Sequence, residues 1–291
     1  MTTVPDPAHL ARLRAYEPER ITEALTTRQP GSMPEPGHRL MIIAADHPAR
    51  GSLGAGSDTL AMADRTDLLA RCAEALTRPG VHGFLGTADL IEDLAVLGAL
   101  DGKLVFGSMN RGGLATSSFE VDDRFTGYDA DGIAQSGLDG GKMLLRVDPD
   151  DPATPRALAA CAGAVNELAG RSLTAMVEPF WSHRTNGRLH NDLNPDAVIR
   201  SIAVASGLGR TSARTWLKLP AVADIERVLA ATTLPCLLLG GEVPDDPEAA
   251  LLLWQRALAC ENALGLVIGR AMLYPPDGDV AAAVDAAVAL L

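Results

Sequence analysis

The chain has 291 residues, of which 47% are hydrophobic and 4% aromatic, and its formal net charge is −12. This length and hydrophobic content suffice for one large core, so we expect a single domain over residues 1–291. The acidic balance disfavours nucleic acid as a partner. The sequence contains no apolar run of about 20 residues that would span a bilayer, so no membrane partner is expected.

The first twenty residues are polar and lack the apolar segment of a signal peptide, which predicts a cytoplasmic protein. The four cysteines lie far apart with no Cys-x-x-Cys pair, and most stand in apolar stretches (Cys72, Cys161, Cys236 and Cys260). They are interpreted as buried apolar side chains in a reducing compartment, and neither a disulfide nor a zinc site is expected.

Residues 1–38 are predicted to form one helix over residues 7–25, followed by a loop rich in proline and glycine. Eight short apolar runs follow, most of them hydrophobic without alternation, as is typical of parallel strands buried on both faces. These runs cover residues 40–45, 82–86, 103–108, 142–147, 173–178, 215–220, 235–241 and 264–269.

Helical patterns fill the gaps between the runs, over residues 59–76, 88–99, 155–169, 195–206, 221–231, 247–259 and 280–290. Eight strand-then-helix units predict an α/β fold of the TIM-barrel type, a (β/α)8 barrel with an extra N-terminal helix. The long segment 109–131 is rich in Gly, Ser, Thr and Asp, and we expect it to lie as a functional loop over the barrel mouth. Residues 181–192 are interpreted as a polar loop.

The chain has 22 arginines and only three lysines, Lys103, Lys142 and Lys218. A lysine retained against this bias is a candidate for work that needs an amine. Lys218 lies between two leucines in a predicted strand, where burial and a second cation would lower its pKa and favour the neutral amine. A neutral amine attacks a ketone or aldehyde to form an iminium. Lys142 is that second cation if its strand faces that of Lys218; the alternative is that Lys218 extends out of the barrel end.

Two carboxylates follow predicted strands, Asp46 after the first and Glu178 at the end of the fifth. Either can act as a general acid or base. The alternative is that they form ion pairs, for Glu178 with Lys142 or Arg146. The sequence does not choose between these roles.

Glycines and an arginine end the last two strands, where this fold commonly binds phosphate. The predicted phosphate-binding residues are Gly240, Gly241, Gly269 and Arg270. Glycine permits close approach of the backbone, and arginine adds charge-assisted hydrogen bonds. His47 follows the first strand and is a candidate for substrate contact. His183 and His190 lack metal-binding spacing and are assigned to the surface, so no metal is expected.

Six short motifs are similar to those of one enzyme superfamily: AADHPARGSL (44–53), GYDADG (127–132), GGKMLLRVD (140–148), VEPF (177–180), WLKLP (216–220) and LVIGRAML (266–273). They resemble the class I aldolases, which include deoxyribose-phosphate aldolase, archaeal-type fructose-bisphosphate aldolases and, nearest in motif, tagatose-bisphosphate aldolase. The resemblance implies that Lys218 forms the Schiff base, that Lys142 supports it, and that Glu178 and Asp46 manage protons and substrate hydroxyls. It implies phosphate binding by the strand-end glycines and Arg270, without a cofactor.

The chain departs from the superfamily at two places. Two more residues separate Asp46 from Gly51 than in the Asp-Gln-Arg-Gly pattern, and Arg146 stands where the relatives carry tyrosine. Both departures bear on which substrate hydroxyls and which stereochemistry the site accepts.

The chain also resembles an actinobacterial barrel group associated with myo-inositol catabolism. That resemblance implies cleavage of 2-deoxy-5-keto-gluconate 6-phosphate to dihydroxyacetone phosphate and malonate semialdehyde. We expect Arg146 or Arg50 to pair the carboxylate of the sugar acid, which an aldolase for a neutral sugar does not need. The alternatives are an aldolase for a ketohexose bisphosphate or deoxyribose 5-phosphate, or a catalytically silent sugar-phosphate-binding barrel. In each case the partner is a phosphorylated small molecule, and a homo-oligomer is compatible with the pattern.

Overall fold

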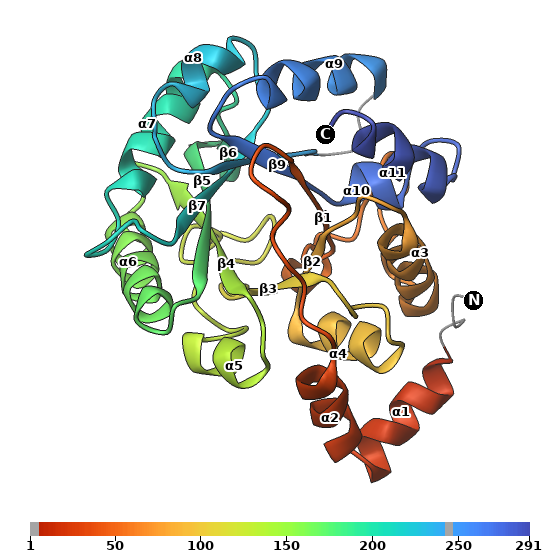
Figure 1. Ribbon diagram of the computed structural model, residues 1–291. Helices are drawn as coiled ribbons and strands as arrows, with labels where there is room; N and C mark the ends of the chain where they lie inside the picture. Colours follow the sequence, from red (N-terminus) through yellow and green to blue (C-terminus); the bar gives the residue numbers. More distant parts are fainter. Residues whose placement is uncertain (1–5, 242–246) are drawn as a thin grey trace.

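The computed structural model describes residues 6–241 and 247–291. Eight parallel strands pair in a ring, and the pairing of β4 with β5 closes it (Figure 1). The barrel strands are β1 (Leu40–Ala44), β2 (Gly83–Gly86), β3 (Leu104–Ser108), β4 (Gly140–Val147), β5 (Thr174–Thr185), β7 (Thr215–Pro220), β8 (Cys236–Leu239) and β9 (Ala263–Ile268). The predicted (β/α)8 barrel is therefore confirmed.

Helices surround the ring of strands (Figure 1). They are α1 (Pro7–Tyr16), α2 (Glu19–Thr27), α3 (Arg65–Thr77), α4 (Ala88–Val96), α5 (Ala130–Gln135), α6 (Thr154–Gly170), α7 (Pro195–Ser206), α8 (Ile225–Leu229), α9 (Pro247–Leu258), α10 (Arg270–Leu273) and α11 (Val280–Val288), with a 3-10 turn η1 (Pro48–Arg50) after β1. Among the described residues, no helix has the length and apolar character needed to cross a bilayer.

The N-terminal segment forms two helices, so the prediction of one helix over residues 7–25 is wrong. Glu17 leaves the helical conformation (φ −140°, ψ 48°), and Pro18 precedes the second helix. Proline disfavours a helical residue before it, which accounts for the break. The predicted start of the third helix at residue 59 is also wrong, because Asp64 accepts hydrogen bonds from the amides of Thr66 and Asp67 and starts α3 at Arg65.

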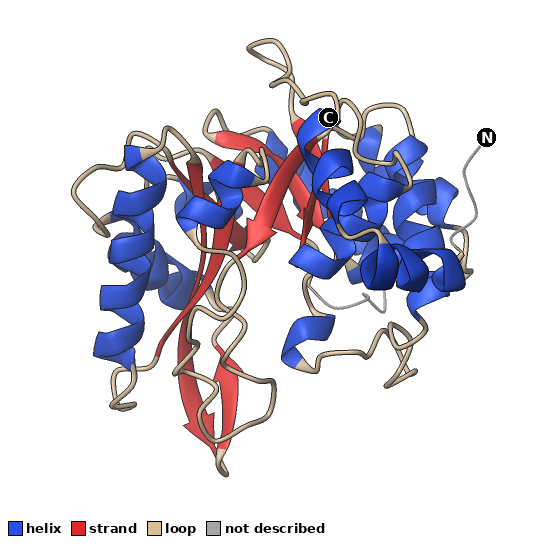
Figure 2. Ribbon diagram, turned by 90° about the horizontal axis from the view of Figure 1, so that it is seen from below, coloured by secondary structure: helices blue, strands red, loops and turns tan. Residues whose placement is uncertain are grey.

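Residues 181–192 form a β-hairpin and not the expected polar loop. β5 continues past the barrel rim and pairs antiparallel with β6 (Arg188–Asn191), and the arm projects from the barrel (Figure 2). Asn186 and Gly187 make the turn with φ of 53° and 77°. An Asn-Gly pair with two positive φ angles is a strong hairpin signal, which outweighs the polar composition of the segment.

Alternation along the strands sets which side chains enter the barrel. One apolar cluster fills the interior, with Met176 and Leu237 among its members, while a second lies between strands and helices. Lys142 pairs in register with Met176, and Lys218 pairs with Leu237. Both lysines therefore lie on the interior face of their strands, which allows their side chains to approach each other.

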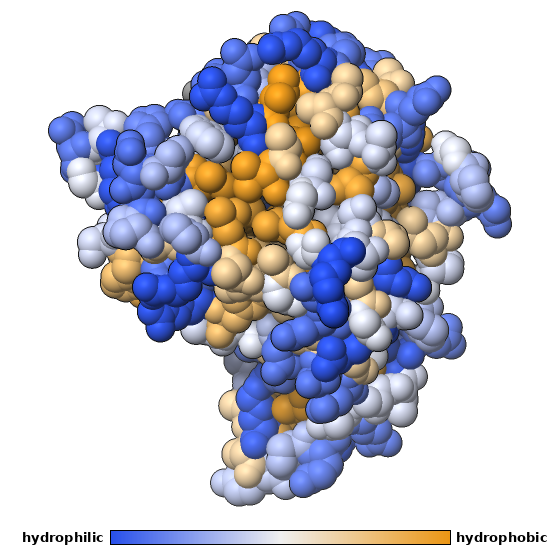
Figure 3. All heavy atoms as spheres, turned by 90° about the vertical axis from the view of Figure 1, so that its left-hand side faces the viewer, coloured by the Kyte–Doolittle hydropathy of each residue, from blue (hydrophilic) through white to orange (hydrophobic). Residues whose placement is uncertain are grey.

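The outer face near α6 and α7 carries apolar side chains across its middle, with hydrophilic groups around them (Figure 3). Leu158, Ile199 and Val204 on these two helices are partly buried against the core. The expected homo-oligomer stays a prediction.

Candidate active site

Glu178 lies between the two lysines inside the barrel. Its Oε1 is 3.0 Å from Lys218 Nζ, and its Oε2 is 2.5 Å from Lys142 Nζ. The lysines are 2% and 3% exposed, and Glu178 is 8% exposed, so solvent screens these charges little. The ion-pair interpretation of Glu178 is thus observed with Lys142 and, in addition, with Lys218. Lys218 does not extend out of the barrel end.

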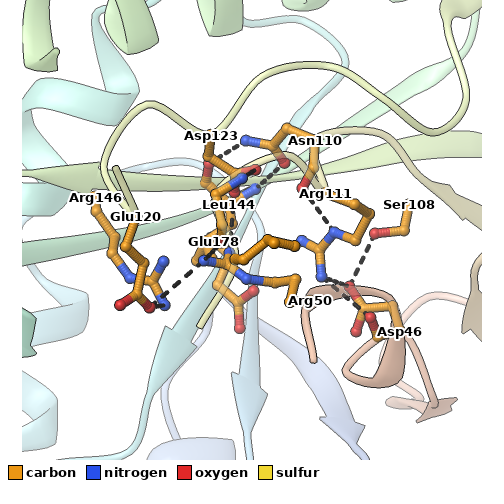
Figure 4. Close-up of polar contacts among 12 residues, drawn as sticks. Asp46, Arg50, Ser108, Asn110, Arg111, Glu120, Asp123, Leu144, Arg146 and Glu178 are labelled. Atoms are coloured by element: carbon orange, nitrogen blue, oxygen red, sulfur yellow. Dashed lines mark hydrogen bonds and ion pairs between the residues drawn. The ribbon is translucent and has the colours of Figure 1, made fainter. Parts of the chain in front are cut away.

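Asp46 is the second buried carboxylate of the site. Its Oδ2 accepts from Lys142 Nζ at 3.0 Å and from the Ser108 hydroxyl at 2.9 Å, and Arg111 Nη1 lies 3.0 Å away (Figure 4). Three donors on one oxygen fix the carboxylate firmly. Lys142 therefore bridges Asp46 and Glu178, and it links the end of β1 to β5.

The charge network keeps both carboxylates ionised. Burial alone would raise the pKa of Glu178, but the attraction of Lys142 and Lys218 outweighs it and lowers the pKa to about 2. Burial likewise opposes ionisation of Asp46, yet Lys142, Arg111 and Lys218 hold its pKa well below the usual range. For Lys142, burial lowers the pKa against the pull of the two carboxylates. In this state Glu178 and Asp46 are proton acceptors.

A second group of charges lies toward the barrel mouth, where the segment 109–127, here called the capping loop, packs against the strand ends (Figure 4). Glu120 Oε1 is 2.9 Å from Arg146 Nη2 and 3.6 Å from Arg50 Nη2. Arg50 Nη1 also binds Asp123 at 2.9 Å. Burial and then the neighbouring Arg146 lower the pKa of Arg50 to about 10. Arg50 and Arg146 therefore meet through a carboxylate of the capping loop.

Asn110 fastens the start of the capping loop to β4. Its Oδ1 accepts from the Leu144 amide at 2.8 Å, and its Nδ2 donates to the Leu144 carbonyl (Figure 4). The side chain thus replaces a strand neighbour for one residue of β4. Arg146 lies two residues further along the same strand, on the interior face shared with Lys142 and Leu144.

The predicted phosphate-binding residues divide between two strand ends. Gly269 precedes α10 at the end of β9, and a Cβ placed on it would lie 3.0 Å from His47 Cε1, so β9 and the turn after β1 are in close contact. Arg270 Nη1 donates to the Gly54 carbonyl at 3.4 Å. Gly240 and Gly241 follow β8, and Gly241 has a φ of 68°.

His47 is partly buried beside these strand ends, and its Nδ1 atom is inaccessible to solvent. Burial, reinforced by Arg270 and Lys218, lowers its pKa to about 3, against the attraction of Asp46. The imidazole is therefore neutral near pH 7, and its ring offers one donor and one acceptor.

A family model described as Cgl0159-like matches residues 38–288. The chain belongs to the Cgl0159-like family. A crystal structure of Cgl0159 from Corynebacterium glutamicum is 50% identical, covers 99% of this chain and 98% of its own, and superposes with a TM-score of 0.95. A search of curated proteins gave no match.

Two more distant solved structures share the barrel fold of this Cgl0159-like chain. A Schiff base forming fructose-1,6-bisphosphate aldolase is 18% identical, covers 93% of this chain and 99% of its own, and has a TM-score of 0.61. A fructose-bisphosphate aldolase from Slackia heliotrinireducens is 14% identical, covers 99% of this chain and 93% of its own, and has a TM-score of 0.60.

Within the family barrel, the structure brings together Lys142, Lys218, Glu178 and Asp46, and it places Arg146 and Arg50 beside them. Sequence reasoning missed the contributions of the capping loop, namely Ser108 at its base and Asn110, Arg111, Glu120 and Asp123 within it. The available signal was a cluster of charged residues among glycines directly after the third strand, in a segment already expected to cover the mouth.

Proposed function

We propose that this Cgl0159-like chain is a class I aldolase in which Lys218 forms a Schiff base with the ketone of a phosphorylated keto-sugar. The observation that carries the proposal is the Lys218 amine, buried inside the barrel and 3.0 Å from a carboxylate that also holds Lys142. A lysine in such a place serves poorly as a surface charge and well as a nucleophile with a proton acceptor in contact.

Glu178 is proposed to carry the protons of Lys218, because it contacts Lys218 directly while Asp46 contacts Lys142. The neutral amine adds to the ketone, its proton passes to Glu178, and loss of water leaves an iminium. A carboxylate then takes the proton of the substrate hydroxyl, the carbon–carbon bond breaks, and its electron pair moves toward the iminium to give an enamine. Protonation of the enamine carbon and hydrolysis release the second product and free Lys218.

The phosphate is proposed to bind at Gly240, Gly241, Gly269 and Arg270, with His47 beside it. Support comes from the contact between His47 and Gly269 and from the φ of 68° at Gly241, which leaves the backbone accessible. Two of the structurally similar proteins are described as a Schiff base forming aldolase and as an aldolase with its catalytic lysine bound to a carbinolamine intermediate. Those descriptions concern other proteins, and they favour the same chemistry here.

The proposed substrate is 2-deoxy-5-keto-gluconate 6-phosphate, cleaved to dihydroxyacetone phosphate and malonate semialdehyde, as in the catabolism of inositol. Arg146 supports a sugar acid, because a sugar phosphate without a carboxylate would leave its buried Nη1 without an acceptor from the described residues. A single-domain, cytoplasmic, metal-independent enzyme remains the prediction.

Borohydride trapping tests the proposal. The protein is incubated with dihydroxyacetone phosphate, reduced, digested and analysed by mass spectrometry. The expected result is an adduct of the ketone on Lys218, lost in Lys218→Ala and retained in Lys103→Ala, a matched control whose amine donates to the Val81 carbonyl outside the site. If no lysine carries an adduct, the proposed Schiff base with dihydroxyacetone phosphate fails, and an aldolase for an aldehyde substrate or a silent binding barrel takes its place.

A further inference from the structure

We propose that Arg111 and Arg146 form a carboxylate subsite, so that the substrate of this site is a phosphorylated keto acid whose acid group lies at the end remote from the phosphate. The inference rests on the proposed aldolase function and names its substrate class. It assigns the acid group to Arg146 together with Arg111, a residue that the sequence analysis did not select, and it assigns Arg50 a supporting role.

The guanidinium groups of Arg111 and Arg146 each have one buried nitrogen that makes no hydrogen bond within the described part of the chain. Arg111 uses Nε and Nη1 on the Asn110 carbonyl and on Asp46, and Arg146 uses Nη2 on Glu120. Arg111 Nη2 and Arg146 Nη1 are buried and have no hydrogen-bond partner among the described residues. A buried donor without a partner is costly, and charged donors more so, which points to an acceptor on the ligand.

The cationic groups around these donors outnumber the carboxylates by one, which favours the binding of an anion. With Lys218 as the cationic iminium of the proposed mechanism, five cationic groups stand with four carboxylates: Arg50, Arg111, Lys142, Arg146 and Lys218 with Asp46, Glu120, Asp123 and Glu178. One further negative charge balances this group. Burial, with the nearby Arg111 adding to it, lowers the pKa of Arg146, and an anion bound there would oppose this effect.

The capping loop makes Arg111 and Arg146 rigid. Asp46 holds one side of Arg111, and Glu120 holds one side of Arg146 while accepting from the Thr116 amide at 3.0 Å. Arg50 is occupied by Asp123, Glu120 and the Gly113 carbonyl, so it anchors the loop and leaves the ligand to the other two. A rigid pair of planar donors suits a planar carboxylate.

The position of the subsite sets the distance between acid and phosphate. Arg146 and Arg111 lie at the ends of β4 and β3, whereas Gly241 and Gly269 follow β8 and β9 on another part of the rim (Figure 1). Lys218 on β7 lies in the interior layer below. A ketone bound to Lys218 would therefore have its phosphate on one side and its acid group on the other.

Aldol addition with three acceptors tests the inference. Dihydroxyacetone phosphate is supplied as donor, and the acceptors are malonate semialdehyde, glyceraldehyde 3-phosphate and propanal, which end in a carboxylate, a phosphate and a methyl group. The wild-type enzyme is expected to favour the carboxylate over propanal by on the order of tenfold or more in kcat/KM. Arg146→Gln and Arg111→Gln should each reduce that ratio by about tenfold.

Arg124→Gln, which changes an exposed arginine of the same loop, is the matched control and should keep the ratio. If Arg146→Gln fails to fold because Glu120 loses its nearest cation, the double variant Arg146→Gln/Glu120→Gln removes the buried carboxylate as well and serves instead. A wild-type enzyme that favours the phosphate acceptor, or that treats the three alike, overturns the subsite. The Lys218 adduct distinguishes the two failures, because it forms whether or not the subsite is correct.

Discussion

At the centre of the barrel, each of the acid and base side chains is held by a charge of opposite sign. Lys142, Lys218, Glu178 and Asp46 were predictable because strand ends and the two-residue alternation place them on the interior side. That Glu178 would bridge both lysines was not predictable, because it depends on side-chain rotamers across three strands. Sequence spacing left it open whether Glu178 would form an ion pair with Lys142 or with Arg146.

The remaining part of the site escaped prediction for a different reason. Arg111, Glu120 and Asp123 belong to a loop without regular periodicity, and their positions follow from long-range pairing with Arg50 and Arg146. Local patterns carry no information on such partners. The composition of the segment predicted only that it would form a functional loop over the barrel mouth.

The lowered pKa of His47 predicts a dependence of stability on pH. Its pKa is about 3 in the folded chain, whereas an unfolded histidine titrates near 6.5. As the pH falls from 6.5 toward 3, the histidine of the unfolded state binds a proton, whereas that of the folded state stays neutral. The free energy of unfolding therefore decreases by about 1.4 kcal/mol per pH unit. Full stability from this group is present above pH 6.5.

Replacing His47 with Gln should remove that dependence. Denaturant unfolding of the wild type and of His47→Gln is compared between pH 6.5 and 4.5, a window in which Glu178, with its pKa of about 2, stays ionised. The free energy of unfolding of the wild type should depend more steeply on pH than that of His47→Gln. The difference in slope should correspond to the uptake of at most one proton on unfolding. Parallel curves would mean that His47 is solvated or already charged in the folded chain.

The elements follow local sequence rules except where proline, asparagine and glycine intervene. Eight apolar runs became eight barrel strands, because parallel strands buried on both faces have a distinct composition. The N-terminal helix broke at Pro18, and the apparent loop after β5 became a hairpin through Asn186-Gly187. Each correction concerns one or two residues whose backbone preferences outweigh the surrounding pattern.

The end of β9 predicts an effect of one added methyl group. A Cβ on Gly269 would lie 2.5 Å from the Ala44 carbonyl oxygen, a backbone atom that cannot move aside cheaply. We expect Gly269→Ala to lower the free energy of unfolding by about 1–3 kcal/mol and to weaken phosphate binding.

Gly163→Ala in α6 is the matched control, because a Cβ there meets nothing within 4 Å. It should raise the free energy of unfolding by about 0.5–1 kcal/mol, since alanine favours the helix. Chemical denaturation measures both variants, and equal behaviour of the two would contradict the crowding at Gly269.

For the molecule as a whole, the contacts of the N-terminal helices and the candidate active site lie in different places. The N-terminal helices pack outside the barrel against α4, where Arg14 pairs with the buried Asp93 at 2.6 Å. Leu10, Leu13, Ile21 and Leu25 supply their buried side chains. Lys142 and Lys218, in contrast, are buried inside the barrel.

Deleting residues 1–27 should therefore separate stability from activity. We expect the loss of the apolar contacts to lower the free energy of unfolding by on the order of 3 kcal/mol. Lys218 should still form its borohydride adduct at a rate within about twofold of the full chain, since Arg28 and its bonds to the Lys103 and Gly137 carbonyls are kept. Thermal unfolding and adduct mass are the measurements, and loss of the adduct in folded protein would show that the helices shape the site.

The scarcity of lysine has a practical consequence for handling the protein. Lys142 and Lys218 are enclosed in the barrel, and the Lys103 amine donates to the Val81 carbonyl. Amine-directed reagents such as succinimidyl dyes, cross-linkers and immobilisation resins thus find almost no side-chain target on the native exterior. A small amine-reactive aldehyde that labels Lys142 or Lys218 in the folded chain has entered the barrel, so the extent of labelling at these two lysines measures how accessible the barrel mouth is.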